Sequence, residues 1–224
     1  MKCAALVSGG KDGWLSVWYA QSSGLSVEAI VTFIPKKLDS FMFHGINSKL
    51  VKEQARLAGM KHIEFLTSGE KEKEQKELEA AFSKLRKLGF EAVITGAIES
   101  EYQRERIERA GVESGLVHFS PLWHKNQTQL LEEILESGHD AIIVAVAADG
   151  MGKEWLGKRI SECKGGLLRL NKANLISPIG EGGEFETFAT ESPLFKKKIE
   201  IKKAKVIWEG SSGFLVMERY VFSP

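Results

Sequence analysis

Short apolar stretches alternate with amphipathic stretches over the first two thirds of the chain. Six of the apolar stretches have the length of strands, and most are continuous, which is typical of strands with both faces covered. They occupy residues 2–7, 27–34, 62–66, 92–95, 116–119 and 141–147. Between them, residues 14–21, 48–57, 71–88, 101–110 and 127–136 have a helical spacing of apolar positions. Strands alternating with helices predict an α/β fold with a doubly wound parallel sheet.

The pattern changes after Asp149, where glycines become frequent and amphipathic helices become scarce. Residues 198–208 and 214–222 alternate in polarity, and the glycine-containing segment 209–213 joins them, so they predict a β-hairpin. We therefore expect two domains: an α/β domain over residues 1–149, and a smaller α+β portion over residues 150–224 that ends in this hairpin.

Composition and charge exclude several classes of protein. Hydrophobic residues make up 43% of the 224 residues, which is enough for a sizeable core. The 31 basic and 30 acidic residues nearly cancel, so bulk charge predicts no stable nucleic-acid partner. Cys3 and Cys163 form neither a disulfide framework nor a zinc site. Without a membrane-length apolar stretch or a signal peptide, we expect a soluble, cytoplasmic protein with no membrane partner. The sequence leaves the oligomeric state open.

The turn after the first predicted strand carries a candidate phosphate site. It consists of Ser8, Gly9, Gly10, Lys11, Asp12 and Gly13. Two glycines let the backbone approach an anion closely, and the following helix offers unpaired N–H groups. A carboxylate beside a phosphate makes sense if a magnesium ion accompanies the nucleotide. On these residues alone, an ordinary strand–helix turn remains the alternative.

The Ser-Gly-Gly-x-Asp pattern of residues 8–12 resembles the pyrophosphate loop (PP-loop) of the N-type ATP pyrophosphatases. These enzymes adenylate a substrate and so cleave ATP to AMP and pyrophosphate. The resemblance implies that residues 8–13 bind ATP, that Asp12 is a Mg²⁺ ligand, and that Lys11 and Asp12 act in catalysis. Gly13 departs from the pattern, because this family usually has Ser or Thr there.

Two later segments are also candidates. Residues 95–104 follow a predicted strand and enter a very polar helix, whose charges are equally typical of a solvated face with ion pairs. Residues 180–187 place Glu181, Glu184 and Glu186 beside glycines. Such a cluster would repel phosphate and attract a cation, and the alternative is an exposed acidic loop.

Together with the PP-loop, these segments resemble the diphthine–ammonia ligase family, and the likeness extends from residue 1 to about residue 195. The resemblance implies a ligase that amidates diphthine on translation elongation factor 2 with ATP and ammonium, through an acyl-adenylate. It also implies further ATP-binding residues, namely Thr95, Gly96, Gln103 and Arg104. The implied substrate-binding residues are Glu99, Glu181, Gly182, Gly183, Glu184, Phe185, Glu186 and Thr187, with Glu184 and Glu186 in catalysis.

Two rival functions and one further segment stay open. A PP-loop enzyme that modifies tRNA would usually need paired cysteines and a basic face, and a non-catalytic nucleotide-binding protein would need no carboxylate cluster. A lysine run at residues 196–198, 202, 203 and 205 either discourages pairing at a sheet edge or forms a docking patch.

Overall fold

The computed structural model describes residues 1–35 and 47–224, which divide into two compact units. The first unit contains Met1–Ser8 and Asp12–Trp123, and the second contains Gly9–Lys11 and His124–Pro224. Its contacts thus divide the chain after Trp123, whereas the sequence predicts a domain boundary after Asp149. No helix in the described part of the chain is long and apolar enough to span a membrane.

The first unit is built on a five-stranded parallel sheet with strand order β3-β2-β1-β4-β5. β1 is buried at its three central positions and β4 at all four, as expected for strands covered on both faces. The strands are β1 (Lys2–Leu6), β2 (Ser26–Pro35), β3 (Lys61–Thr67), β4 (Ala92–Thr95) and β5 (Val117–Phe119).

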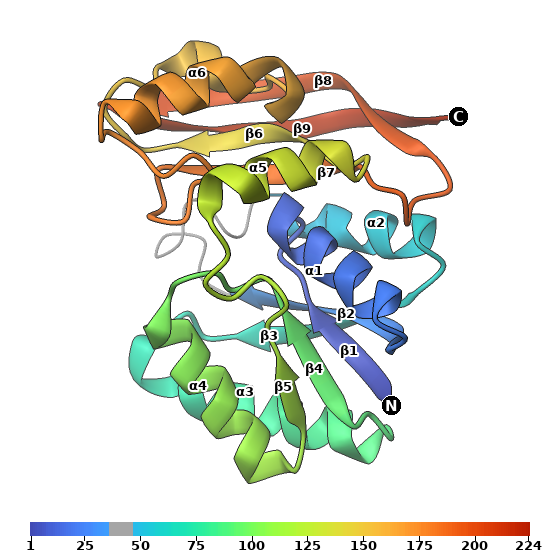
Figure 1. The fold of residues 1–224 in the computed structure, drawn as a ribbon. Helices are drawn as coiled ribbons and strands as arrows, with labels where there is room; N and C mark the ends of the chain where they lie inside the picture. Colours follow the sequence, from blue (N-terminus) through green and yellow to red (C-terminus); the bar gives the residue numbers. More distant parts are fainter. Residues whose placement is uncertain (36–46) are drawn as a thin grey trace. The chain divides into compact units, whose positions relative to one another are not determined.

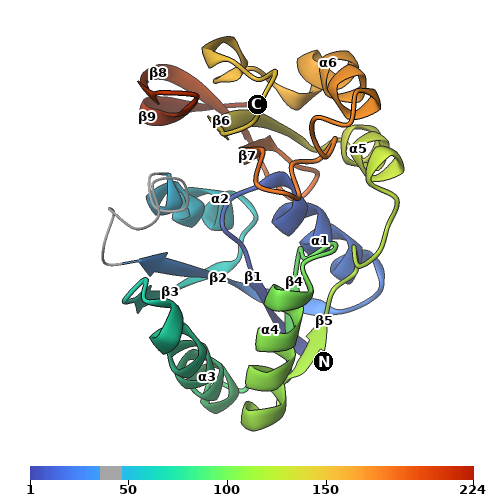
Figure 2. The same cartoon turned by 90° about the vertical axis from the view of Figure 1, so that its left-hand side faces the viewer.

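Helices cover both faces of this sheet, with α1 and α2 on one side and α3 and α4 on the other (Figure 2). This arrangement confirms the predicted doubly wound α/β fold. The helices are α1 (Lys11–Ser22), α2 (Val51–Leu57), α3 (Lys71–Lys87) and α4 (Glu101–Ser114), and a short 3₁₀ turn, η2 (Ser48–Leu50), precedes α2.

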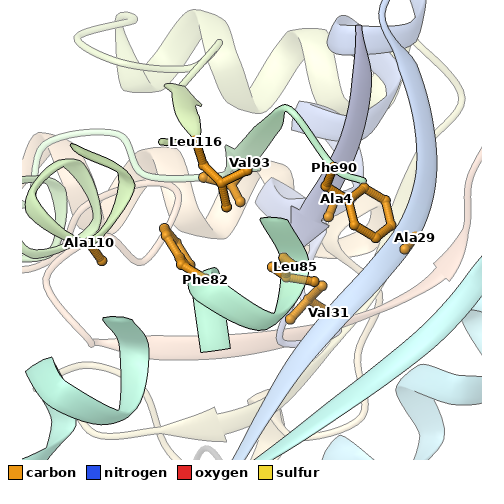
Figure 3. Close-up of a cluster of buried hydrophobic side chains, with 9 residues drawn as sticks. All are labelled: Ala4, Ala29, Val31, Phe82, Leu85, Phe90, Val93, Ala110 and Leu116. Carbon is orange, nitrogen blue, oxygen red and sulfur yellow. The ribbon is translucent and has the colours of Figure 1, made fainter. Parts of the chain in front are cut away.

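One apolar cluster fixes α3 and α4 against the sheet (Figure 3). Phe82 and Leu85 lie one turn apart on α3 and are fully buried, so α3 presents one apolar face to the strands. They pack in one cluster with Val93 of β4 and Val31 of β2. β4 and β2 are the two strands that flank β1 in the sheet. The packing holds α3 and α4 against the three central strands of the sheet.

The second unit contains an antiparallel sheet with strand order β7-β6-β9-β8 (Figure 1). α6 packs against β6 and also contacts α5. The predicted hairpin is confirmed as β8 and β9. The elements are α5 (Gln127–Glu136), β6 (Asp140–Val146), η3 (Lys153–Trp155), α6 (Ile160–Lys172), β7 (Phe185–Glu191), β8 (Lys198–Glu209) and β9 (Ser212–Ser223).

Three elements of the second unit differ from the sequence-based expectation. β6 was expected in the parallel sheet, because its continuous apolar run is buried at all seven positions, but it pairs with β7 and β9. β7 and α6 were not predicted. α6 contains Gly165 and Gly166, which weaken a helix prediction, and Gly166 makes room for the Trp155 ring, since a Cβ there would lie 2.7 Å from it.

Candidate functional site

The carboxyl ends of β1 and β4 form the first cluster of candidate residues, here called the first-turn cluster: Ser8, Asp12, Gly13, Thr95 and Gly96. β1 and β4 are neighbours at the centre of the strand order, where the chain connections diverge, and such switch points bind ligands in α/β proteins. A Cβ on Gly96 would lie 2.8 Å from both the Asp12 carbonyl carbon and the Gly13 nitrogen. The end of β4 therefore packs directly on the backbone that opens α1.

Thr95 belongs to a polar network behind this contact. Its Oγ1 lies 2.8 Å from His118 Nε2 and 2.7 Å from Ser120 Oγ. Burial lowers the pKa of the His118 imidazole, with Glu108 acting in the opposite direction and Arg104 in the same one. A neutral imidazole can accept a hydrogen bond from either hydroxyl. The Thr95 hydroxyl, predicted to bind ATP, is thus engaged with His118 and Ser120.

Gly13 makes a second close contact in this cluster. A Cβ at this position would lie 3.1 Å from Val7 Cγ1, which is a tight contact with a methyl group of a buried side chain. The serine found in related PP-loops would therefore require a small shift of Val7, whereas a side chain at Gly96 would meet backbone atoms.

The second cluster, here called the loop cluster, lies in the second unit. It contains Gly9, Gly10 and Lys11 of the PP-loop, together with the residues that contact them. Ala189 N–H donates to the Gly9 carbonyl at 2.8 Å, and Lys11 N–H donates to Thr187 Oγ1 at 3.2 Å. Gly9 has a φ of 104°, which an L side chain rarely adopts. β7 therefore holds the loop through the Thr187 hydroxyl and the Ala189 backbone.

The Lys11 ammonium is buried within the loop cluster. It donates to the Ile179 carbonyl at 2.6 Å and lies 5.5 Å from the centroid of the Phe185 ring. The side chain is only 2% exposed, so the carbonyl dipole and the ring face replace part of its hydration. Phe185, expected to face a cationic substrate, here faces Lys11.

Residues 180–187, here called the acidic segment, are held by hydrogen bonds to Ser177. Glu184 Oε1 accepts from Ser177 N–H at 2.7 Å, and Ser177 Oγ accepts from Glu181 N–H at 3.1 Å. Glu184 Oε2 is buried, and no described residue donates a hydrogen bond to it. Glu186 follows Phe185 on β7, so strand alternation directs it to the other face of the strand.

The glycines of this segment are of two kinds. Gly180 has a φ of 78°, and a Cβ there would lie 2.6 Å from the Phe185 carbonyl oxygen. Gly182 and Gly183 are exposed, and the Glu184 carboxylate lies over Gly182. Gly180 is thus required by the fold, whereas Gly182 and Gly183 leave the backbone accessible.

The polar helix of the first unit is α4, and most of its charged groups are paired. Arg104 Nε donates to Glu108 Oε1 at 2.7 Å, and the guanidinium lies 4.7 Å from the Trp123 ring centroid. Arg106 and Arg109 form ion pairs with glutamates of α3, as the interpretation of a solvated, ion-paired helix predicts. Glu99 and Gln103 are exposed. Their predicted roles, and that of Arg104, stay predictions.

The carboxylate of Asp12 suits a magnesium ion that binds together with a nucleotide. The described residues contain no group of three or more His, Cys, Asp or Glu side chains able to hold a metal. Mg²⁺ is commonly held by one or two carboxylates together with substrate phosphates. Asp12, in the first turn of α1, matches that mode of binding.

The structure adds residues that the sequence analysis did not select. Ile179 and Ala189 act through backbone atoms, which leave no mark in a sequence. His118 and Ser120 had a detectable signal, because His118 lies in β5, the strand next to β4, and Ser120 directly follows it, so both are at the same carboxyl end of the sheet as Thr95.

Two family models match the chain. The diphthamide synthase N-terminal domain matches residues 1–118, and the diphthamide synthase C-terminal domain matches residues 126–222. The chain belongs to the diphthine–ammonia ligase family. Members of this family are ligases that form a C–N bond, so both the predicted family and the predicted enzyme class are confirmed.

Individual diphthine–ammonia ligases resemble the chain over most of its length. The one from Schizosaccharomyces pombe is 35% identical over 230 residues, which are 95% of this chain and 38% of that protein. The one from Bos taurus is 31% identical over 234 residues, which are 96% of this chain and 88% of that protein. The chain therefore spans well under half of the yeast relative and most of the bovine one.

A solved structure described as a predicted subunit of tRNA methyltransferase, from Methanocaldococcus jannaschii, aligns with 88% of this chain. Its TM-score is 0.45 and its sequence identity 17%.

Proposed function

We propose that this chain converts diphthine on translation elongation factor 2 to diphthamide, with ATP and ammonium as co-substrates and AMP and pyrophosphate as products. The family supplies the reaction type, which is ATP-dependent amidation of diphthine. We further propose the identity of the protein substrate, the route through an adenylate and the roles of the individual residues. The reaction would occur in the cytoplasm, which suits two buried cysteines that form no disulfide.

One observation carries the proposal: the PP-loop and the acidic segment are hydrogen-bonded together. Thr187 accepts from the backbone of Lys11, and Ala189 donates to Gly9. Two segments that lie far apart in the chain, one suited to phosphate and one to a cation, therefore meet in the second unit. Amidation by adenylation needs both functions, because ATP and an amine donor act on the same carboxylate.

In the proposed reaction the diphthine carboxylate attacks the α-phosphorus of ATP, pyrophosphate departs, and ammonia then displaces AMP from the acyl-adenylate. Backbone N–H groups of Gly9 and Gly10 and the Ser8 hydroxyl orient the phosphates. The Lys11 ammonium, which donates to the Ile179 carbonyl, contributes its positive charge to the phosphate site without a direct contact. Asp12 would hold Mg²⁺, which neutralises charge on the departing pyrophosphate. Thr95, Gly96, Gln103 and Arg104 complete the proposed ATP-binding set.

Glu184 is suited to the ammonium half of the reaction. Its buried Oε2 has no donor among the described residues, and an ammonium ion would provide one. The same carboxylate can take a proton from ammonium and leave the nucleophilic amine. Glu99, Glu181, Gly182, Gly183, Phe185, Glu186 and Thr187 complete the proposed substrate-binding set.

Two rival functions fit the findings less well. An enzyme that modifies tRNA would not match both diphthamide synthase models. A non-catalytic nucleotide-binding protein would show no turnover of ATP.

Incubation of the chain with ATP, ammonium and diphthine-bearing elongation factor 2 tests the proposal. We expect AMP and pyrophosphate by chromatography, and diphthamide by mass spectrometry of a proteolytic fragment. ADP and phosphate would instead indicate an acyl-phosphate, and no amide would refute the function. Asp12→Ala should lower turnover by about 10²-fold or more. Asp149→Ala, at an exposed aspartate, is the matched control.

A further inference from the structure

A cavity of about 400 Å³ lies in the antiparallel sheet of the second unit. Ile142, Ile199 and Leu215 supply buried apolar side chains from three strands. Arg159, Lys202 and Lys203 supply positive charge. None of these residues belongs to the PP-loop or the acidic segment, so the proposed reaction does not account for the cavity.

Two bulges in the β8–β9 pair explain why consecutive residues line it. Residues 199–204 all contribute, although a regular strand would turn every second side chain away. Ile201 and Lys203 pair with adjacent residues of β9, which leaves Lys202 as an extra residue on β8. The next register shift leaves Glu218 as an extra residue on β9. Bulges re-aim side chains at binding surfaces, and here they turn charged and apolar residues toward one cavity.

The charges around the cavity are held with different strength. Arg159 donates to Asp140 at 2.8 Å and also to Glu191, so it is fixed within the sheet. Lys202 pairs with Glu200 at 2.5 Å, and Lys203 pairs with Glu218 at 2.6 Å. These two lysine pairs are exposed, and exposed pairs contribute little, so either lysine can exchange its partner for another carboxylate.

The open edge of the sheet adds backbone groups to this surface. β8 is the last strand in the order and is hydrogen-bonded to β9 alone among the described strands. Lysines on such an edge can simply discourage pairing. Bulges can serve the same role. Edge protection does not account for the cavity, whereas binding an extended peptide uses the edge, the side-chain cavity and the cations together.

We propose that residues 199–204 of β8 and the adjoining cavity form a docking groove for an extended acidic segment of the protein substrate. An aliphatic side chain of that segment fills the cavity between Ile142 and Leu215, and its carboxylates replace Glu200 and Glu218 as partners of Lys202 and Lys203. The identity of the bound protein rests on the proposed function.

Direct binding of diphthine-bearing elongation factor 2, measured by calorimetry at two salt concentrations, tests the groove. The double variant Lys202→Glu/Lys203→Glu should weaken binding by about tenfold or more and reduce the dependence on salt. The control Lys76→Glu/Lys87→Glu makes the same change in net charge at exposed positions of α3 and should stay within about twofold of the unmodified chain.

Ala204→Trp should fill the cavity and weaken binding by about tenfold, and Ala204→Ser should leave it unchanged. The KM for ATP should be the same in all of these variants. Test variants that bind like their controls, or an unmodified chain that does not bind the factor, would overturn the groove. Binding that depends on Lys202 and Lys203, but without formation of AMP or amide, would refute the proposed function and leave the groove intact.

Discussion

The two parts of the PP-loop are adjacent in the chain but are held by different forces. Asp12 and Gly13, in the first unit, lie against Gly96. A Cβ on Gly96 would be only 2.8 Å from their backbone atoms. Gly9 and Lys11, in the second unit, are held by hydrogen bonds to β7 and to the Ile179 carbonyl. One part depends on close backbone packing and the other on polar contacts.

The difference predicts how each part responds to change. A packed backbone contact has no alternative arrangement, so any added atom displaces the loop. A hydrogen-bonded contact tolerates a residue that retains the donor or acceptor, provided that the residue can adopt the local backbone conformation, which at Gly9 favours glycine. Substitutions should therefore act by size in the first-turn cluster and, at the Thr187 side chain of the loop cluster, by hydrogen-bonding capacity.

Gly96→Ala should have the largest effect. The new methyl group would overlap the backbone of Asp12 and Gly13, so the start of α1 must move. A displacement of about 1 Å that misplaces reacting groups can cost about 10²-fold in rate. Steady-state amidation and thermal unfolding of the same preparation separate a misplaced loop from an unfolded chain.

Gly165→Ala is the matched control for that experiment. Gly165 lies within α6, and its added Cβ would meet only Arg169, at 3.7 Å. This replacement should be neutral or stabilise the helix by up to about 1 kcal/mol. Equal losses in both variants would contradict the packing argument.

Glu184→Gln should rank second. Glutamine keeps an acceptor for Ser177 N–H, so the segment should keep its fold, but the negative charge on the buried oxygen disappears. We expect amidation to fall by about 10²-fold if this charge handles ammonium. ATP affinity from calorimetry should stay within about threefold, under roughly 0.7 kcal/mol.

Glu186→Gln sharpens the same test. Glu186 alternates onto the face of β7 opposite Phe185 and Thr187, which both contact the loop. A smaller loss than in Glu184→Gln would assign the proton transfer to Glu184. Parallel loss of ATP binding in both variants would mean that the carboxylates support the loop instead of handling ammonium.

The sequence predicted the regular elements of the first unit and one motif of each cluster. α5 and β4 have the predicted bounds, because their apolar spacing and flanking residues agree. β6 was assigned to the wrong sheet, since a continuous apolar run indicates burial on both faces and says nothing of strand direction.

The contacts between the two motifs could not be predicted from the sequence. The bond from Lys11 N–H to Thr187 Oγ1 joins positions far apart in the chain, and the Ile179 carbonyl belongs to no recognisable pattern. The Lys11 side chain was expected at a phosphate because a lysine follows two glycines. Its burial against Phe185 depends on tertiary packing, which no local pattern reports.

Thr187→Val should have a moderate effect confined to the loop cluster. Valine keeps the shape of threonine but removes the acceptor of Lys11 N–H, and an unsatisfied buried donor costs about 1–3 kcal/mol. Thr187→Ser keeps the hydroxyl and should retain most of the stability. Denaturant unfolding of the pair checks this, and equal losses would show that packing, and not the hydrogen bond, holds this part of the loop.

The smallest effect should come from His118, behind the first-turn cluster. Burial lowers its pKa in the folded chain below the unfolded value of about 6.5. Well above that pH neither state is protonated at this site, and the folded chain keeps its full stability. As the pH falls below about 6.5, the unfolded chain takes up a proton that the folded chain resists, so stability decreases.

His118→Gln can still hydrogen-bond to Thr95 and Ser120 but cannot titrate, so its thermal midpoint should fall less steeply between about pH 7 and pH 5. His62, whose pKa is also lowered by burial, should account for part of the remaining slope. Parallel midpoint curves for the two chains would show that His118 keeps the same proton affinity when the chain unfolds, and its network with Thr95 would then be exposed to solvent in the folded state.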